Sequence, residues 1–503
     1  MHILLPPQIE YILNTFSSNN FDAYIVGGCV RDLLMNKTPT DWDICSSALP
    51  EQTIKLFKNH KILKNGLKHG TVTVLFKDKS KYEITTFRSD GIYTDNRHPD
   101  QVSYVTDIKT DLSRRDFTIN AFAYNQEKGL LDFFDGITDL KNKVIRCIGN
   151  PDTRFQEDGL RILRALRFSS VLNFNIEIET SNSILKNWRL LDNISIERIT
   201  TEFNKLLLGV NVNNVVNKYF FLDNINFDSI FIENNENATL LIRLSYFFIN
   251  MKKNSLNLKL DNKSNNVISE LIKYHDLNII PDKIYIKQCL NKMGIERFQQ
   301  LLILKHCVSP EIKNLLNSII ENKECFNLKQ LAINGTDIKQ IGIKESKKIG
   351  EHLNNILNLV INEKIINNKG DIMSEIINME YQNLLDIAKT ASENAYSPYS
   401  NFKVGAAIKC KNGMIYTGCN IENASFSATI CAERVAAAKA ISENNVDFLA
   451  IAVYVQDEKL FPPCGICRQF LAEFSDDLVV IYANKNETVF TNINLLLPSK
   501  FAL

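Results

Sequence analysis

The spacing of apolar and polar residues changes along the chain and predicts a different kind of structure in each part. Up to about residue 145, short apolar runs bounded by turn residues are typical of strands, as in "YEITTF" (82–87). From about residue 146 to 370, apolar residues recur every three or four positions, as in "EDGLRILRALRF" (157–168), which predicts amphipathic helices. The pattern therefore predicts a mixed α/β region followed by an all-helical one.

A third pattern begins near residue 376 and continues to the end of the chain. This region is rich in alanine, and its run "FLAIAVYV" (448–455) is too short to span a membrane, so we interpret it as a buried strand. The polar stretch 362–371 is the best candidate for a linker before this region, and 254–266 is the segment most typical of a loop. The predicted domains are residues 1–145, 146–215, 216–371 and 376–503.

Length and composition fit a protein of several globular domains. A chain of 503 residues exceeds one hydrophobic core, and 45% hydrophobic with 23% charged residues is ordinary for globular proteins. The net charge of +1 excludes a global basic field, so any contact with RNA would use a local basic surface. No apolar run reaches the length of a membrane span, and no signal peptide pattern is present. We expect a cytoplasmic protein that does not contact membranes.

The first candidate site combines a glycine pair with alternating aspartates. Gly27 and Gly28 stand where a strand turns into a helix, and without side chains their backbone amides can approach a triphosphate. In "TDWDIC", Asp41 and Asp43 point to the same face because side chains alternate along a strand. Two such carboxylates can hold two Mg²⁺ ions for phosphoryl transfer. Glu83 is a candidate third carboxylate, although an edge-strand salt bridge gives the same pattern.

Longer stretches of the sequence indicate which family this set of motifs resembles. Segments 91–124, 132–168 and 334–353 resemble the bacterial class II tRNA nucleotidyltransferases, which comprise CCA-adding enzymes and related poly(A) polymerases. The resemblance implies an α+β head, a helical neck, a helical body and tail that bind tRNA, and addition of CCA to tRNA 3′ ends from CTP and ATP. The nucleotide-binding residues that it implies are Gly27, Gly28 and Arg31 at the triphosphate, Arg115 and Asp116 at the ribose, and Asp158 and Arg161 at the base.

Several readings of this part stay open. Positions three apart share a helix face, so Asp158 and Arg161 can address a base edge together, while an ordinary ion pair is the structural alternative. Four further arginines surround them and can reach phosphates or form surface pairs: Arg146, Arg154, Arg164 and Arg167. Poly(A) polymerase, or an enzyme that adds only A or only CC, is the alternative activity. Segment 91–124 includes the loop region of complete CCA-adding enzymes and favours the full activity.

A second candidate site lies in "ICAERVA" and "PCGICRQ". Cys431, Cys464 and Cys467 offer three thiolates at a spacing typical of zinc, and no fourth ligand accompanies them. A structural zinc site is closed by four protein ligands, whereas a catalytic site leaves one position for water. Glu433 would then be the proton shuttle for attack of water on C4 of a cytosine ring. Arg434 is placed to offset the negative charge of three thiolates.

Residues 382–501 resemble the small tetrameric cytidine deaminases, in "SPYSNFKVGAA", "GCNIENAS" and "LLPSKF" as well as in the cysteine motifs. The resemblance implies deamination of cytidine or deoxycytidine with Zn²⁺, and a homotetramer. In that family Asn420 and Glu422 would bind the ribose hydroxyls, and Phe402 and Phe501 would sandwich the base, Phe501 from a neighbouring subunit. An editor of polynucleotide cytosines is disfavoured, because Glu422 at a free 3′-hydroxyl leaves no room for a linked phosphate. A deaminase half that acts mainly as an oligomerisation scaffold is the remaining alternative.

The sequence thus predicts a multidomain fold with an α+β nucleotidyltransferase head, an all-α neck, body and tail, and a three-layer α/β/α cytidine deaminase domain. The predicted protein is a bifunctional enzyme that uses Mg²⁺ at one site and Zn²⁺ at the other.

Overall fold

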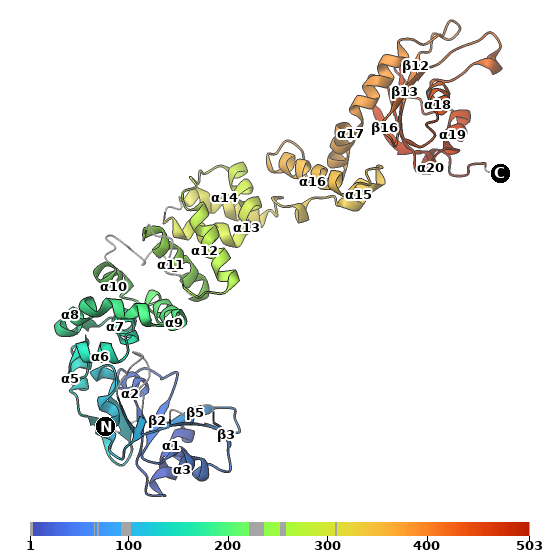
Figure 1. Ribbon diagram of the computed structural model, residues 1–503. Coiled ribbons are helices and arrows are strands. Elements are labelled where there is room, and N and C mark those ends of the chain that lie inside the picture. Colours follow the sequence, from blue (N-terminus) through green and yellow to red (C-terminus); the bar gives the residue numbers. More distant parts are fainter. Residues whose placement is uncertain are drawn as a thin grey trace. The chain divides into compact units, whose positions relative to one another are not determined.

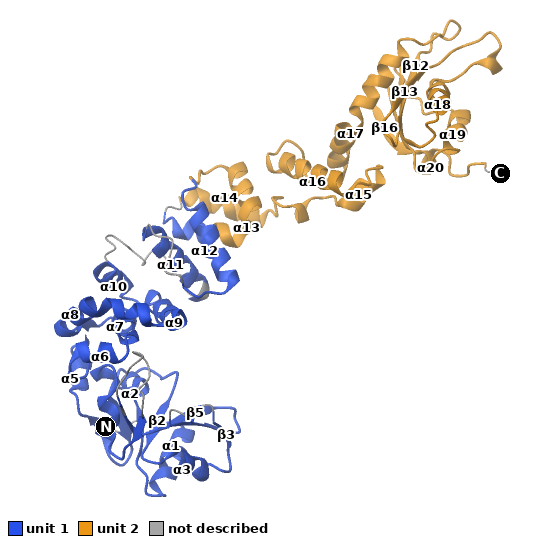
Figure 2. Ribbon diagram, viewed as in Figure 1, with its two compact units in different colours: residues 1–277, 299–307 blue, residues 278–298, 308–503 orange. Residues whose placement is uncertain are grey.

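The computed structural model describes residues 4–64, 66–67, 70–91, 102–220, 236–251, 258–306 and 309–501. The chain forms two compact units (Figure 2): unit 1 comprises residues 1–277 and 299–307, and unit 2 comprises residues 278–298 and 308–503. Unit 1 carries the glycine and aspartate motifs, and unit 2 carries the cysteine motifs. The predicted loop region of segment 91–124 includes residues 92–101, which lie outside the described residues.

A seven-stranded sheet forms the head of unit 1 (Figure 1), with the strand order β3-β4-β5-β2-β1-β8-β9. Neighbouring strands are antiparallel except β2 and β5, which are parallel. The strands of this sheet are β1 (Ala23–Val26), β2 (Asp43–Ser46), β3 (Lys61–Leu63), β4 (Thr71–Leu75), β5 (Lys81–Thr86), β8 (Phe122–Asn125) and β9 (Gly129–Asp132). Two smaller pairs are β6 (Arg88–Asp90) with β7 (Val102–Tyr104), and β10 (Val144–Ile145) with β11 (Asn175–Ile176).

The head sheet has a hydrophobic core on each face. In α1 (Pro7–Ser17), Ile9, Ile12, Leu13 and Phe16 recur at helical spacing and are buried against the sheet together with residues around α3 (Pro50–Leu56). Along β1, side chains alternate between this core and a second core on the other face, as expected for a strand buried on both sides. β1 leads directly into α2 (Gly28–Leu34), which places the glycine pair at the carboxyl end of β1.

Helices make up most of the rest of unit 1, as the sequence pattern predicts. They are α4 (Ile108–Ser113), α5 (Gly136–Lys141), α6 (Pro151–Glu157), α7 (Leu160–Leu172), α8 (Ile178–Asn187), α9 (Ile196–Leu207), α10 (Val212–Tyr219), α11 (Glu236–Asn250) and α12 (Asn262–Tyr274). Part of the predicted loop 254–266 is therefore helical. The reason is a capping residue: the side chain of Asp261 accepts a hydrogen bond from the N–H of Ser264 and starts α12. Residues 254–257 lie outside the described residues.

The helical part of unit 2 ends in a long helix. It begins with α13 (Lys283–Leu304), which is bent at Gly294 and whose residues from Gln299 onward belong to unit 1. The helices that follow are α14 (Pro310–Glu321), α15 (Gly335–Gln340), α16 (Ser346–Ile361) and α17 (Lys369–Ser392). Within the predicted linker 362–371, residues after Ile361 connect α16 to α17, and α17 already begins at Lys369. Ile372 and Ile376 at the start of α17 are buried with residues of α15 and α16.

The carboxyl-terminal domain has three layers. Its sheet has the order β13-β12-β14-β15-β16, with β14 and β15 parallel. The elements are β12 (Val404–Cys410), β13 (Ile415–Cys419), α18 (Ala432–Ser442), β14 (Phe448–Val455), α19 (Gly465–Ala472), β15 (Val479–Ala483), β16 (Thr488–Asn492) and α20 (Ile493–Leu496). Alternate residues of β14 pack against α17 on one face and against α18 and α19 on the other. The buried strand at 448–455 and the three-layer fold are both confirmed.

Within the ranges described above, no helix combines the length and the apolarity that a membrane crossing requires.

Candidate functional sites

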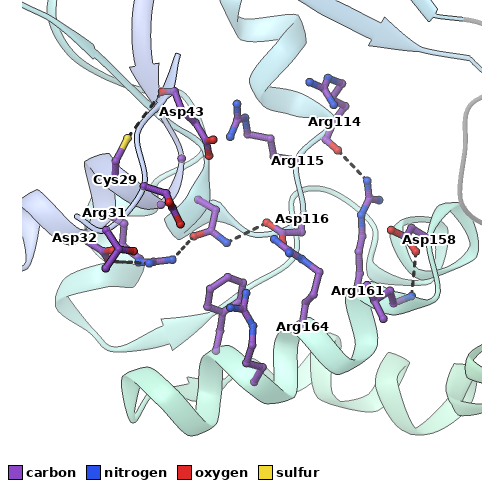
Figure 3. Close-up of a pocket in the computed structure, with 18 of the residues that line it drawn as sticks. Cys29, Arg31, Asp32, Asp43, Arg114, Arg115, Asp116, Asp158, Arg161 and Arg164 are labelled. Carbon is purple, nitrogen blue, oxygen red and sulfur yellow. Dashed lines mark hydrogen bonds and ion pairs between the residues drawn. The ribbon is translucent and has the colours of Figure 1, made fainter. Parts of the chain in front are cut away.

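A cavity of about 520 Å³ opens in unit 1 between the head sheet and α7 (Figure 3). All nine residues that the sequence assigns to nucleotide or Mg²⁺ binding line it: Gly27, Gly28, Arg31, Asp41, Asp43, Arg115, Asp116, Asp158 and Arg161. These residues span more than 130 positions of the sequence, so the fold brings together what the motifs predicted separately.

Gly27 and Gly28 form the turn between β1 and α2. Gly27 has φ of +77°, a conformation that favours glycine. A Cβ atom at Gly27 would lie 2.6 Å from Nη1 of Arg115, so the absent side chain also leaves room for this guanidinium. Arg31 lies one helical turn further along, and its Nη1 donates to Oδ1 of Asn120 at 2.7 Å. The turn therefore places Arg31 and Arg115 beside the backbone of the glycine pair, which no side chain covers.

Asp43 is the first residue of β2, and both Asp41 and Asp43 line the cavity. Asp41 lies in a bend two residues before the strand, so strand alternation does not place it as the sequence predicted. Although the Asp43 side chain is open to solvent there, the protein around it raises its pKa; Arg115 opposes this rise, and the charge of Asp41 adds to it. A carboxylate whose pKa is raised by a neighbouring negative charge is stabilised by a cation, and carboxylate oxygens are preferred ligands of Mg²⁺. The pair therefore fits a Mg²⁺ site.

Glu83 lies directly beside Asp43, because the two residues are paired in register where β2 and β5 run parallel. Paired residues in neighbouring strands project to the same face of a sheet. Glu83 is exposed and is not one of the described residues that line the cavity. Its role as a third carboxylate stays a prediction.

Asp116 is buried, with 7% of its surface exposed, at the centre of a hydrogen-bond network. Its Oδ2 accepts from Nε of Arg164 at 2.8 Å, and its Oδ1 accepts from Nδ2 of Asn120 at 3.1 Å. Burial raises the pKa of Asp116, but the charge of Arg164 and the hydrogen bonds from both partners outweigh burial and lower it to about 2. The carboxylate is therefore ionised and held in one orientation.

Asp158 and Arg161 do not share a helix face, and the sequence prediction is wrong on this point. Asp158 has extended backbone (φ −144°, ψ 103°) between α6 and α7, and Arg161 lies in the first turn of α7. Oδ1 of Asp158 accepts from the N–H of Leu160, a local hydrogen bond that stabilises this non-helical conformation just before α7. Asp158 pairs with Arg198 of α9 at 2.9 Å, and Arg161 pairs with Glu157. Both side chains still reach the cavity, but each is held by a different partner.

The further arginines near α7 fall into two groups. Arg164 and Arg167 line the cavity, whereas Arg146 and Arg154 are engaged by acidic neighbours outside it. Sequence reasoning missed five polar residues of the cavity wall: Asp32, Thr40, Arg114, Asn120 and Arg198. Arg114 and Asn120 belong to the motif "RRDFTINA", so their neighbours offered a signal. Arg198 offered none, since it meets Asp158 only through the packing of α9 on α7.

Three thiols converge in unit 2. Cys431 and Cys464 are the residues before α18 and α19, and Cys467 lies in the first turn of α19. Their sulfurs lie within 4.8 Å of one another, and those of Cys431 and Cys464 are 3.7 Å apart. Tetrahedral Zn²⁺ with bonds of about 2.3 Å separates two thiolates by about 3.8 Å, so this spacing fits the metal. Among the described residues, this is the one such group of possible metal ligands.

Glu433 and Arg434 complete the surroundings of the thiols. Glu433 is 4% exposed; burial raises its pKa to about 7, and the charge of Cys431 adds to the rise. Arg434 donates to the carbonyl of Thr429 at 3.1 Å, and its Nη2 lies 4.0 Å from Sγ of Cys431. A hydrogen bond with Cys467 is the main cause of the lowered pKa of Cys431, and Arg434 contributes to it. The cluster therefore favours a thiolate beside a buried, protonatable carboxyl group.

The two predicted ribose-binding residues follow β13. Both polar atoms of the Asn420 side chain form backbone hydrogen bonds, which fix it in place. The carboxylate of Glu422 accepts from the N–H of Tyr399 at 2.9 Å and from the hydroxyl of Ser400. The hydrogen bond from Ser400 is the main cause of the lowered pKa of Glu422. Glu422 is half-buried and ionised, which leaves it able to accept hydrogen bonds from a diol.

The two predicted base-binding aromatics differ in their surroundings. Phe402 is half-buried and packs edge-to-face on Phe461, with ring centroids 5.3 Å apart. Phe501 is 70% exposed, and its N–H donates to Oε1 of Gln469 at 3.0 Å. The ring of Phe501 therefore projects into solvent in a single chain.

Family models match three parts of the chain. Residues 23–146 match the poly A polymerase head domain, and residues 173–218 match the probable RNA and SrmB-binding site of polymerase A. Residues 379–483 match the cytidine and deoxycytidylate deaminase zinc-binding region.

Full-length relatives are found for the larger part of the chain. The CCA-adding enzyme of Ligilactobacillus salivarius (strain UCC118) is 36% identical over 377 residues, which cover 71% of this chain and 93% of the relative. That of Lactobacillus johnsonii is 34% identical over 399 residues, covering 74% and 96%. A crystal structure of the Bacillus stearothermophilus CCA-adding enzyme in complex with CTP is similar with a TM-score of 0.61 and 26% identity, over 76% of this chain and 99% of that chain.

Proposed function

Since the chain belongs to the family of CCA-adding enzymes and carries a cytidine deaminase zinc-binding region near its carboxyl end, we propose that it is a bifunctional enzyme. One part adds CCA to tRNA 3′ ends from CTP and ATP, and the other hydrolyses cytidine or deoxycytidine to the uridine compound and ammonia. The observation that carries the first activity is the convergence of nine motif residues on one cavity. The second rests on the three-thiol cluster beside Glu433.

In the proposed transfer, the 3′-oxygen of tRNA bonds to the α-phosphorus of the nucleotide and pyrophosphate leaves. Asp41 and Asp43 would hold Mg²⁺, which supplies positive charge to the phosphates and favours loss of the 3′-hydroxyl proton. The uncovered amides at Gly27, together with Arg31, receive the triphosphate. Asp116, ionised and fixed by Arg164, is placed to accept hydrogen bonds from the ribose.

Asp158 and Arg161 are proposed to select the base. Cytosine and adenine both present an amino group beside a ring nitrogen that accepts a hydrogen bond, so one carboxylate and one guanidinium can serve both. Uracil and guanine present the opposite pattern at this edge. The ion pairs of Asp158 with Arg198 and of Arg161 with Glu157 hold the two side chains in place before a base arrives.

The test is incubation of the protein with Mg²⁺ and a tRNA that lacks its 3′ terminus, supplied with CTP alone, ATP alone, or both. We expect two additions with CTP and a third only when ATP is also present. A long A tail, or A alone, would favour the poly(A) polymerase or A-only alternative, and additions that stop after two cytidines would favour the CC-only alternative. Replacement of both Asp41 and Asp43 by alanine is the control and should abolish every addition.

In the proposed deamination, bound Zn²⁺ would lower the pKa of water at the position that the three thiolates leave open. Glu433 would accept a proton from the attacking water and pass it to N3 of cytosine as the water oxygen bonds to C4. It would then move the remaining hydroxyl proton to the amino group, so that the C4–N4 bond breaks and ammonia leaves. Asn420 and Glu422 are proposed to hold the ribose hydroxyls. We further propose a homotetramer in which Phe501 covers the base in a neighbour's site, since the ring projects into solvent in one chain.

Measurement of the ammonia released distinguishes the proposed and alternative functions of the deaminase part. We expect release from cytidine and none from a cytosine-containing oligonucleotide, because a 3′-phosphate would meet the negative charge of Glu422. Equal release from the oligonucleotide would favour a polynucleotide editor. A zinc-loaded protein that releases none from either substrate would favour the scaffold alternative.

A further inference from the structure

Three arginines of the unit 1 cavity gather around one aromatic ring. The guanidinium carbons of Arg31, Arg164 and Arg167 lie 5.2, 5.5 and 4.0 Å from the ring centroid of Phe168. Phe168 lies on α7, is 6% exposed, and lines the cavity together with all three arginines. Cations within about 6 Å of a ring face are attracted to it, and all three fall within this range.

Each of these arginines also forms an ion pair with a carboxylate. The ion pairs are Arg31 with Asp32 in α2 at 2.7 Å, Arg164 with Asp116 at 2.6 Å, and Arg167 with Glu202 in α9 at 2.7 Å. The three carboxylates come from three different segments, whereas Phe168 is common to all three arginines. The ring therefore lies where α2, α7 and the Asp116 segment meet.

Like charges at this separation repel one another, and an arginine side chain has many rotamers. A ring that attracts all three guanidinium groups lowers this repulsion and restricts their positions at the same time. Seven arginines and five aspartates line the cavity, so the groups that face it carry more positive than negative charge, while Glu157 and Glu202 pair with Arg161 and Arg167 behind its wall. A polyphosphate supplies the matching negative charge, and arginine binds phosphate oxygens with paired N–H donors.

We propose that Phe168 is a positioning residue that holds Arg31, Arg164 and Arg167 where the polyphosphate of the incoming nucleotide binds. The proposal deepens the nucleotidyl transfer proposed above and rests on it. Because Phe168 acts through phosphate-binding groups, its contribution is the same for CTP and ATP. It also extends to inorganic tripolyphosphate, which has neither base nor ribose.

The experiment compares wild type, Phe168→Leu and Phe168→Tyr in kcat and KM for CTP and ATP, and in inhibition by Mg²⁺–tripolyphosphate. We expect Phe168→Leu to raise both KM values and the inhibition constant by a common factor of about ten, with a smaller change in kcat. Phe168→Tyr keeps the ring face and should stay within about twofold of wild type.

Phe57→Leu is the matched control, because Phe57 is also fully buried in unit 1 but does not line the cavity. Unchanged KM and inhibition constants in Phe168→Leu would overturn the proposal, as would an equal loss in Phe57→Leu or in Phe168→Tyr. A wild-type protein that binds tripolyphosphate but adds no nucleotide would overturn the proposed function, while the effect of Phe168→Leu on tripolyphosphate binding still decides the role of the ring.

Discussion

At the scale of single residues, the two sites use buried carboxyl groups in opposite ways. Asp116 is kept ionised by Arg164 and Asn120, which suits a fixed acceptor of hydrogen bonds. Glu433 is buried beside thiols, and within the described part of the chain no ion pair joins its carboxylate to a cation, although the charge of nearby Arg434 acts on it. This suits a group that gains and loses a proton. The two carboxyl groups differ in pKa because their neighbours differ, since aspartate and glutamate side chains are similar acids in water.

The lowered pKa of Asp116 predicts how unit 1 responds to acid. The folded pKa of about 2 is below the unfolded value of about 3.9, so the contribution to stability is complete above the unfolded value and is lost as the pH falls toward 2. We expect Asp116→Asn to lower the free energy of unfolding by about 2 kcal/mol at pH 6, and by less at pH 3. Urea unfolding followed by tryptophan fluorescence measures this, since Trp42 and Trp188 both belong to unit 1. A difference that does not shrink on acidification would contradict the assignment.

The position of Glu433 predicts that metal binding and catalysis can be separated. Glu433 is outside the group of three sulfurs, so Glu433→Gln should keep its zinc. Without a group that transfers protons, cytidine deamination should fall at least about 100-fold. Metal analysis and an ammonia assay on the same sample test both statements. Loss of zinc along with activity would show that Glu433 supports the metal directly.

Residues that act within one motif could be predicted from the sequence, and residues that meet only through packing could not. The spacing of Cys431, Cys464 and Cys467 sufficed because zinc demands a short list of ligands in a fixed geometry. Asp158 shows the opposite case: spacing suggested a shared helix face with Arg161, but its side chain accepts a hydrogen bond from the N–H of Leu160 and pairs with the distant Arg198. A carboxylate's partner is set by charge and space, which neighbours in the sequence do not reveal.

At the scale of elements, glycines in the carboxyl-terminal sheet allow helices to approach very closely. A Cβ atom on Gly418 in β13 would lie 2.4 Å from the carbonyl oxygen of Ala432 in α18, and one on Gly405 in β12 would lie 2.1 Å from that of Ala388 in α17. Both contacts are with backbone, which cannot rotate away. Helix α18 begins directly after Cys431, so the packing of α18 on β13 positions the Cys431 thiol.

Gly418→Ala should therefore displace α18 and weaken zinc binding, in addition to a cost of about 1–3 kcal/mol for overpacking. Gly350→Ala is the matched control, because its Cβ would meet nothing within 4 Å and α16 should gain up to about 1 kcal/mol from the better helix former. Zinc content and calorimetric unfolding measure both variants. Full zinc occupancy in Gly418→Ala would show that the sheet tolerates the added methyl group.

Most elements of the fold follow from the apolar pattern, and the start of α17, like that of α12, is an exception. The polar composition of 362–371 suggested a linker, yet Asn368 caps α17 by accepting a hydrogen bond from the N–H of Asp371, and the helix continues to Ser392. Asparagine and aspartate are common both in loops and at helix starts, so composition could not distinguish the two.

At the scale of the whole molecule, the proposed tetramer makes a prediction that separates the two activities. Phe501→Ala should leave the protein tetrameric and CCA addition unchanged, while cytidine deamination falls because the neighbouring site lacks its covering ring. Analytical ultracentrifugation with both activity assays tests this. Fully active deaminase that sediments as a monomer would exclude the tetramer, and a loss of CCA addition would show that the two sites depend on each other.

Helix α17 has a further consequence for how such a chain can change in evolution. Its first turns are buried against α15 and α16, and its last turns, with Leu384 and Ala388, are buried against the sheet of the carboxyl-terminal domain. An α-helix turns by about 100° and rises about 1.5 Å per residue. One residue inserted between these two buried stretches would therefore rotate one packing surface by more than a quarter turn relative to the other. Insertions of three or four residues restore the phase most closely, so related fusions are expected to differ in this helix by whole turns.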